Sequence, residues 1–333
     1  MKGSKSRMQG KESLEQGASG KSNVGIDASK RWLDAHALPF EKSLRVPNTS
    51  EGIRKLKRWI ATFGPAFVVI EATGRWHRQV QRSLFASGIP VTVVDPFRVR
   101  MFAKAQGILA KTDRLDARVL ALFATMMSPK LRPPAPEAME ELKEIVVARE
   151  SAVVEETSLK NQLAAGTSCF LKRHLQRRID RIAKDLLDLE REILRRIRAD
   201  EGLATRYAIL TSIPSFGFVV AATLLACLPE LGACNAKEVA MLAGLAPIAD
   251  ESGERKGARV VRGGRPALRR VLYLAALTAA RRNPDGKAFY QRLIAAGKPA
   301  KVVLVALARK LVVLANTLIG QNRTWQIETP KCS

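Results

Sequence analysis

The stretch KTDRLDARVLALFA, residues 111–124, places two aspartates three positions apart at the head of an apolar run. In a helix this spacing puts Asp113 and Asp116 on one face. Acids at a helix start also offset unpaired N–H groups, so Thr112 or Asp113 as an N-cap is the simpler interpretation. In the second interpretation both carboxylates are metal ligands. Other residues of the chain are needed to choose between the two interpretations.

Two further acids occupy strand-like positions. Asp27 lies in the apolar stretch GIDAS, and Glu71 ends the apolar run of VVIEATG. An unpartnered carboxylate beside a buried strand is costly, although each acid alone could be a turn residue. Together with Asp113 and Asp116 they form an ordered set of four acids, which repel unless cations lie between them. Such hard oxygen ligands suit Mg²⁺ or Mn²⁺, and two ions would hold both oxygens at a scissile phosphate.

The charge of the chain indicates the partner. Among 333 residues, 56 Lys and Arg exceed 31 Asp and Glu, which gives a net charge of +25. An excess this large indicates a polyanion, and nucleic acid is the most direct choice. Aromatic residues make up only 5% of the chain, which disfavours stacking on single strands as the main binding mode.

A second constellation lies in residues 243–276, where Ser252 is the only serine in a segment rich in Gly and Arg. Glycines allow close backbone approach, and Arg side chains bind phosphates. The cations that follow the serine are Arg255, Lys256, Arg259, Arg262, Arg265 and Arg269. One interpretation is a solvated turn that touches the DNA backbone, with Ser252 as a bystander. The other makes Ser252 a nucleophile on phosphorus, held among cations.

Upstream of this segment, residues 210–232 have the pattern of a helix–hairpin–helix element. A tight turn around Gly217 leads into an apolar helix, whose first amides would hold a phosphate without reading sequence. A plain helix–turn–helix packing unit is the alternative interpretation.

Local patterns predict an α/β region with a mixed sheet, followed by helices. Strands are expected within 23–38 and 41–49, buried strands within 65–74 and 89–96, and helices over 50–64 and 75–88. The Pro-rich residues 128–138 mark a boundary. Beyond it, residues 139–199 are rich in Glu, Lys, Arg and Leu and would turn at 164–168.

The helical region carries an a/d seam, typical of a coiled coil. Its members are Ile179, Ile182, Leu186, Leu189 and Ile193. An antiparallel arm, a dimerisation stalk and an ordinary helical bundle all agree with this pattern. The expected domains are a disordered polar tail over 1–22, an α/β domain over 23–130, a coiled-coil region over 137–200 and a helical domain over 205–325.

Location follows from two features. The four cysteines form no CxxC pair, so reduced thiols in a cytoplasmic protein are expected, and the N-terminal residues lack the apolar core of a signal peptide. The apolar residues 300–320 are long enough to span a membrane, but Arg309 and Lys310 lie at their middle. Because charge is costly there, a buried soluble helix is expected and no membrane partner.

Several motifs together resemble one family. The stretches GIDASK, IEATG, KTDRLDARVLA, ADESGERKG and GGRPALRRVLYLAA look like those of the DEDD-type transposases of the insertion sequence one-ten family. The resemblance runs from about residue 23 to about residue 320, and the last motif is most similar to the one-one-one-one subgroup. It implies a RuvC-like domain of ribonuclease-H type, a coiled-coil region and a C-terminal transposase domain.

The same resemblance implies roles for residues. Asp27, Glu71, Asp113 and Asp116 would bind Mg²⁺, and Ser252 would form a covalent link to DNA. It also implies a structured bridge RNA that pairs with donor and target DNA. A phosphoserine link would conserve the energy of the phosphodiester bond, and the chain has no GxxxxGKS loop for a nucleotide.

The resulting expectation is a transposase or site-specific recombinase that acts on double-stranded DNA at element ends and target. Because acids and serine lie in different domains, a homo-oligomer is expected, a dimer that forms a tetramer in the synaptic complex. Two alternatives stay open. One is a RuvC-type Holliday-junction nuclease in which water attacks, so that no covalent adduct forms. The other is a non-catalytic nucleic-acid-binding protein, which the intact set of acids disfavours.

Overall fold

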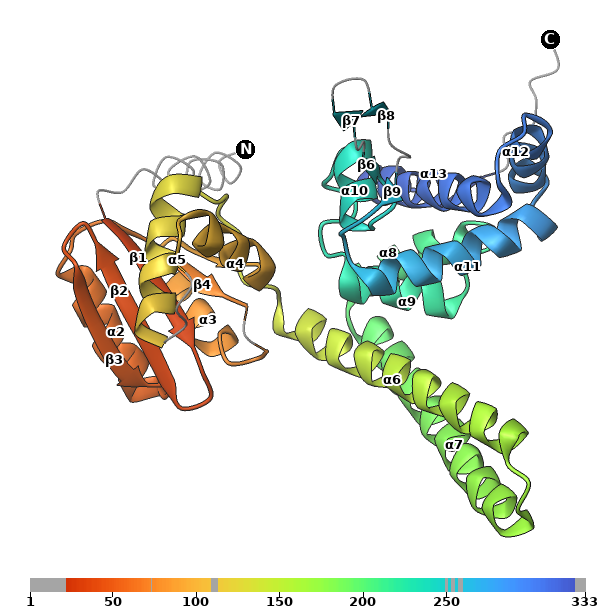
Figure 1. The fold of residues 1–333 in the computed structure, drawn as a ribbon, viewed down its shortest axis with the longest axis horizontal. Coiled ribbons are helices and arrows are strands. Elements are labelled where there is room, and N and C mark those ends of the chain that lie inside the picture. The colour runs from red at the N-terminus through yellow and green to blue at the C-terminus, as the bar shows by residue number, and fades with distance from the viewer. Residues whose placement is uncertain are drawn as a thin grey trace. The chain divides into compact units, whose positions relative to one another are not determined.

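The computed structural model describes residues 22–72, 74–108, 113–248, 251–252, 255–256 and 260–326, and at 113–114, 251–252 and 255–256 it describes the backbone alone. All but the last residue of the expected polar tail over 1–22 lies outside these ranges. The chain divides into two compact units, Met1–Pro134 and Ala135–Ser333, and Figure 1 shows their elements.

The first unit is built on a five-stranded mixed sheet with strand order β3-β2-β1-β4-β5. Its strands are β1 (Ser22–Ala28), β2 (Trp32–Leu38), β3 (Lys42–Pro47), β4 (Ala66–Glu71) and β5 (Val91–Val94). The strands β1, β2 and β3 form an antiparallel meander, and β4 and β5 join them in parallel pairs. The parallel strands are almost entirely apolar, as expected for strands covered on both faces.

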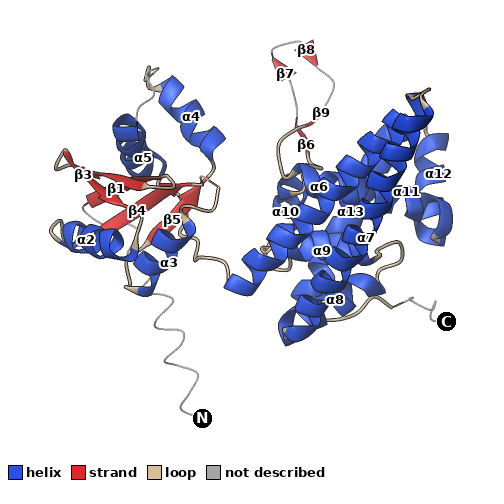
Figure 2. Cartoon of the chain, turned by 90° about the horizontal axis from the view of Figure 1, so that it is seen from below, coloured by secondary structure: helices blue, strands red, loops and turns tan. Residues whose placement is uncertain are grey.

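Helices cover both faces of this sheet, and Figure 2 shows α2 and α3 on one face and α4 and α5 on the other. Their bounds are α2 (Ser50–Ala61), α3 (Arg78–Ala86), α4 (Pro96–Ala105) and α5 (Asp113–Met127). The expected strands and the helices over 50–64 and 75–88 are confirmed. Helix α4 was not predicted; Asp95 caps it by accepting hydrogen bonds from the N–H groups of Phe97 and Arg98.

The alternation of β1 assigns its residues to the two faces. Val24 and Ile26 pack in the cluster with α2 and α3. Gly25 and Asp27 therefore face the layer of α5. A Cβ on Gly25 would overlap the carbonyl oxygen of Ala117, so glycine at this position lets α5 lie directly on β1.

The second unit begins with two long helices, α6 (Glu137–Ala165) and α7 (Cys169–Ala199), which pack side by side as an antiparallel arm (Figure 1). Ile179 and Ile182 of the predicted seam are buried with Leu159 of α6, and Leu186 packs against them. Ile193 is buried in the main helical core. The antiparallel helical pair is confirmed, and a role of this arm as a dimerisation stalk stays a prediction.

The remaining helices form that core. They are α8 (Glu201–Ser212), α9 (Phe218–Cys227), α10 (Ala236–Leu242), α11 (Pro266–Arg282), α12 (Pro284–Ala295) and α13 (Ala300–Gly320). Within the described residues α13 is long and apolar enough to cross a membrane, but half of its apolar window is buried. Leu307, Leu311 and Leu318 of α13 lie in the common core. The predicted α/β plus all-α class is thus confirmed.

Candidate active site

A row of polar residues crosses the sheet on the face that α5 covers. The parallel pairing of β1 with β4 matches Ile26 with Ile70, so Asp27 and Glu71 occupy the next matched positions. On the other side, Asp27 pairs with Asp34 of β2. Since matched residues of neighbouring strands point to the same face, these three acids occupy matched positions of three adjacent strands on one face of the sheet.

Asp34 is an acid that the sequence analysis missed. It is buried, and its carboxylate accepts two hydrogen bonds from Arg45 of β3, from Nε at 2.7 Å and from Nη2 at 3.0 Å. The guanidinium therefore balances the charge of Asp34. The available signal was an acid inside WLDAHAL, a strand that had to pair with the strand carrying Asp27.

Helix α5 supplies the other two predicted acids. Asp113 is its first residue, and the half-buried Asp116 directly precedes Ala117, whose carbonyl lies against Gly25 of β1. The start of α5 and the carboxyl ends of β1 and β4 thus belong to one part of the first unit. In open α/β sheets, ligands bind outside the carboxyl ends of the strands.

The residue types at this edge fit a hard divalent cation, because all four candidates are carboxylates. Among the described side chains, no three His, Cys, Asp or Glu residues lie close enough together to form a metal-ligand group. The side chain of Asp113 is outside that description. The sheet therefore brings Asp27 and Glu71 to adjacent strands, and the set of four stays a prediction.

A cationic and aromatic cluster in the loops after β1 and β4 was also missed. The loop after β4 carries Trp76, with Arg75 Cζ 5.0 Å and Lys30 Nζ 6.0 Å from its ring centroid. Asn48 Nδ2 donates to the carbonyls of Ser29, at 2.9 Å, and Trp76, at 3.1 Å, and so ties the loops after β1 and β4 together. The signal was the run RWHR at residues 75–78, separated from Glu71 by three residues.

In the second unit, Ser252 lies on a small hairpin between α10 and α11. Ser252 of β7 (Glu251–Ser252) pairs with Arg255 of β8 (Arg255–Lys256). Below it, β6 (Pro247–Ile248) pairs with β9 (Val260–Val261), and Figure 2 shows β7 and β8 beyond this pair, away from the helices. The hairpin thus holds the serine backbone outside the helical core.

Two of the residues predicted to bind nucleic acid, Arg265 and Arg269, instead form hydrogen bonds within the protein where the hairpin joins α11, which we call the base of the hairpin. Arg265 Nη1 donates to the carbonyl of Cys227 at 2.8 Å, and the guanidinium forms two hydrogen bonds with Glu230, at 2.8 and 2.7 Å. Arg269 donates to the carbonyl of Gly263. Both guanidinium groups are therefore engaged within the protein, whereas Arg262 is exposed. For Arg255 and Lys256 the backbone alone is described, and Arg259 lies outside the description.

Replacing Gly264 by alanine is expected to loosen this base. Gly264 has φ +65°, and a Cβ there would overlap the backbone of Gly244. Gly263→Ala is the matched control, because its φ is +68° but nothing lies within 4 Å of the added Cβ. Left-handed backbone costs a β-carbon about 1–2 kcal/mol, and overpacking adds about 1–3 kcal/mol. Urea unfolding should show the larger loss for Gly264→Ala; equal losses would mean that the Gly244 contact contributes nothing.

The turn between α8 and α9 leads into an apolar helix at Gly217, as the sequence predicts. The residue in the left-handed region is Ser215, with φ 78°, whereas Gly217 has φ −94° and forms the N-cap of α9. The Oγ of Ser215 is buried, with no partner among the described residues. Residues 220–227 of α9 are all buried, so this helix is chiefly a packing element. The binding of phosphate by the amides after Gly217 stays a prediction.

A buried thiol in this unit is not a rival nucleophile. Cys227 is free and buried at the end of α9. Burial raises the pKa of the Cys227 thiol, so the reactive thiolate is scarce at neutral pH. Its carbonyl instead serves the hairpin base by accepting from Arg265.

The mixed sheet and its acids define a RuvC-like enzyme domain, joined here to a helical unit. Residues 24–168 match a family model described as Transposase, that of the DEDD transposases of IS110 type. Residues 207–291 match a second model, described as Transposase IS116/IS110/IS902 family. The chain belongs to the IS110 family of transposases.

Two relatives span nearly the whole chain, and a third matches part of it. The pilin gene-inverting protein of Moraxella bovis is 27% identical over 316 residues, which cover 91% of this chain and 97% of that protein. Its counterpart in Moraxella lacunata has the same identity and coverage. A 43.6 kDa protein of insertion element IS110 from Streptomyces coelicolor is 30% identical over 124 residues, 37% of this chain and 31% of that protein. The predicted family and enzyme class are confirmed, and DNA is the substrate.

Proposed function

We propose that this transposase exchanges DNA strands through a phosphodiester link to Ser252, with Asp27, Glu71, Asp113 and Asp116 holding Mg²⁺ or Mn²⁺. The observation that carries the proposal is the shared register of Asp27 and Glu71 on adjacent parallel strands, on the face that receives α5. The Moraxella relatives support it, because their printed name describes inversion of a gene.

The covalent step conserves one phosphodiester bond. The Ser252 oxygen attacks the scissile phosphorus, the serine proton passes to a base, and the bond from phosphorus to a sugar oxygen breaks. The sugar oxygen takes a proton from the protonated base or from water and leaves as a hydroxyl, while phosphate stays on the serine. In the reverse step a hydroxyl of the new strand attacks the phosphoserine and releases the enzyme. Since one phosphodiester is exchanged for another, joining needs no ATP.

The protein side chains prepare the phosphate for this attack. Bound at the acids, Mg²⁺ or Mn²⁺ would neutralise charge at the scissile phosphate. Arg262, together with Arg255, Lys256 and Arg259, would contact the DNA backbone around the serine. We assign Arg265 and Arg269 to positioning of the hairpin, because their guanidinium groups are held by Glu230 and the carbonyls of Cys227 and Gly263.

Mixing two inactive variants tests the shared active site. Asp27 lies in the first unit and Ser252 in the second, so a dimer or a tetramer in the synaptic complex can combine acids from one protomer with the serine of another. Asp27→Asn and Ser252→Ala proteins should each be inactive, and their mixture should regain partial strand exchange. An active species that stays monomeric in light scattering would contradict the proposed oligomer.

A guide RNA is the second proposed partner. The net charge of +25 supplies more Lys and Arg side chains than the phosphates of one short DNA duplex can engage. The purified cytoplasmic protein should bind a structured RNA from its own element, with affinity that falls steeply with salt. Changing the pairing loops of this RNA should redirect the DNA target without a protein mutation, as in other RNA-guided enzymes. If protein free of RNA recombines the DNA of its element with full sequence selectivity, the proposal of a guide RNA is wrong.

A further inference from the structure

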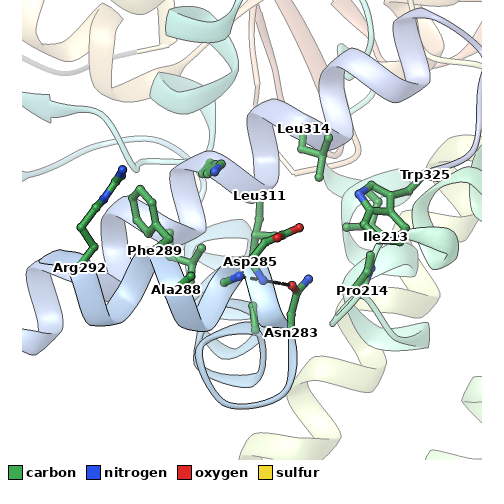
Figure 3. Close-up of a pocket in the computed structure, with 14 residues that line it drawn as sticks. Ile213, Pro214, Asn283, Asp285, Ala288, Phe289, Arg292, Leu311, Leu314 and Trp325 are labelled. Atoms are coloured by element: carbon green, nitrogen blue, oxygen red, sulfur yellow. Dashed lines mark hydrogen bonds between the residues drawn. The ribbon is translucent and has the colours of Figure 1, made fainter. Parts of the chain in front are cut away.

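A pocket with a cavity volume of about 470 Å³ opens in the helical part of the second unit. Pockets that bind small ligands measure about 300–1,000 Å³, so this one is large enough for a compact ligand. Its apolar lining includes Leu311 and Leu314 of α13 and Ile213 from the turn after α8 (Figure 3). Among the described residues, its lining includes none of the candidate metal-binding acids Asp27, Glu71 and Asp116 and no residue of the Ser252 hairpin.

Two aromatic side chains line the pocket on different sides. Phe289 of α12 and Trp325, beyond the end of α13, lie on opposite sides of Leu311 in Figure 3. The backbone N–H of Trp325 donates to Ser212 Oγ at 2.8 Å, which fixes the chain at that point. Ring faces such as these bind nucleic-acid bases by stacking.

Cations adjoin the same wall. Lys310 Nζ lies 5.2 Å and Arg292 Cζ 5.5 Å from the centroid of the Phe289 ring. Both side chains are exposed, and both line the pocket. A phosphate attached to a base in the pocket would therefore meet two positive charges at the rim.

One acid makes the pocket selective for ligand type. Asp285 lines it and is the only acidic residue between Pro266 and Gln326. The capping of α12 does not require its carboxylate, because Asn283 Oδ1 accepts from the N–H groups of Asp285, at 2.9 Å, and Gly286, at 3.3 Å. A simple anion would be repelled by Asp285 and a simple cation by Arg292 and Lys310. A ligand that carries both a phosphate and a hydrogen-bond donor satisfies all three.

We propose that this pocket binds one unpaired nucleotide of a nucleic-acid strand. The base stacks at Trp325 and donates its exocyclic amine to Asp285, and the phosphate lies against Arg292 and Lys310. Cytosine, adenine and guanine have such an amine, whereas uracil and thymine do not, so the pocket prefers the first three. The inference rests on the proposed function in one respect, that the strand belongs to the nucleic acids which the recombinase handles.

Binding of labelled hexanucleotides to the full chain tests this preference. Fluorescence anisotropy at raised salt would compare C₆ with U₆ as RNA and C₆ with T₆ as DNA, and the arm with the larger preference identifies the source of the nucleotide. We expect C₆ to bind about tenfold more tightly. Asp285→Asn should remove the preference, since an amide both donates and accepts. Trp325→Phe should retain it, because a ring remains, while losing the quenching of tryptophan fluorescence by C₆.

Charge-neutralising variants distinguish binding in the pocket from general electrostatic attraction between the basic protein and an oligonucleotide. Arg292→Gln and Lys310→Gln should weaken both oligonucleotides and lower the salt slope by about 0.7 each. Lys287→Gln, on the same helix but outside the pocket lining, is the matched control and should change the salt slope less. Equal binding of C₆ and U₆ as RNA together with equal binding of C₆ and T₆ as DNA in wild type, or an unchanged preference in Asp285→Asn, would overturn the proposal. Ser252→Ala should keep the preference, so failure of the covalent mechanism leaves this test intact.

Discussion

Replacing Ser252 by alanine is expected to eliminate both the covalent protein–DNA adduct and all strand exchange. The hydroxyl is the proposed nucleophile, and no other group can take over a step that depends on its position. Loss of a nucleophile of this kind lowers rates by about a thousandfold or more. The β7–β8 pairing uses backbone groups, so alanine keeps the hairpin. The measurement is the fraction of radiolabelled DNA that stays with the protein in denaturing electrophoresis.

Ser215→Ala provides the matched control. Its Oγ is buried and has no partner in the described part of the chain, so the loss of this hydroxyl should leave the adduct intact and at most weaken DNA binding. If Ser252→Ala still forms the adduct, another residue is the nucleophile. If it loses the adduct but still cuts DNA, water attacks, and the protein acts as a RuvC-type nuclease.

Replacing Asp116 by asparagine should abolish strand cleavage while DNA and RNA binding stay within about twofold of wild type. The amide keeps the shape of the side chain but removes one ligand charge, which costs metal sites at least about 10–100-fold. Asp113→Asn should behave alike, and EDTA should reproduce both effects in wild type. The free energy of unfolding should not fall, because removing one of several carboxylates relieves repulsion.

The variant Asp34→Asn tests whether cleavage depends on the predicted metal ligands alone or on any acid in this row of the sheet. Asp34 stands in the same row as Asp27, but Arg45 holds its carboxylate at 2.7 and 3.0 Å. Its loss should lower stability, since Arg45 loses its partner, and should leave cleavage measurable in Mg²⁺. Full recombination by both Asp113→Asn and Asp116→Asn would refute the four-acid site. If Asp34→Asn loses as much cleavage activity as these two variants, the metal site is not restricted to the four predicted acids.

The local spacing of apolar residues was enough to predict the strands and helices that bury one distinct apolar face. The strands around Asp27 and Glu71 and the seam with Ile179 and Ile182 were predicted because apolar spacing alone specifies them. Helix α4 was missed because its short, mixed sequence carries little periodicity, and its start depends on the Asp95 cap. The turn before α9 was placed around Gly217, which is the N-cap of the helix, but local sequence does not reveal that Ser215 adopts the left-handed conformation.

The candidate site divides in the same way. Residue type and order identified Asp27 and Glu71, but their neighbourhood depends on a parallel register that only the folded sheet defines. Asp34 went unnoticed because its importance arises from pairing with Asp27. Arg265 was expected to bind phosphate, since sequence cannot show that Glu230 and the carbonyl of Cys227 engage its guanidinium.

Peptide mapping of the trapped adduct tests the central claim most directly. Trypsin cuts after Lys237 and Arg255, and the peptide Glu238–Arg255 contains one hydroxyl side chain, that of Ser252. After denaturation, nuclease treatment and digestion, mass spectrometry should find a nucleotide phosphate on this peptide and on no other. A modified peptide from elsewhere in the chain, or recombination with no modified peptide at any time, would contradict the covalent role of Ser252.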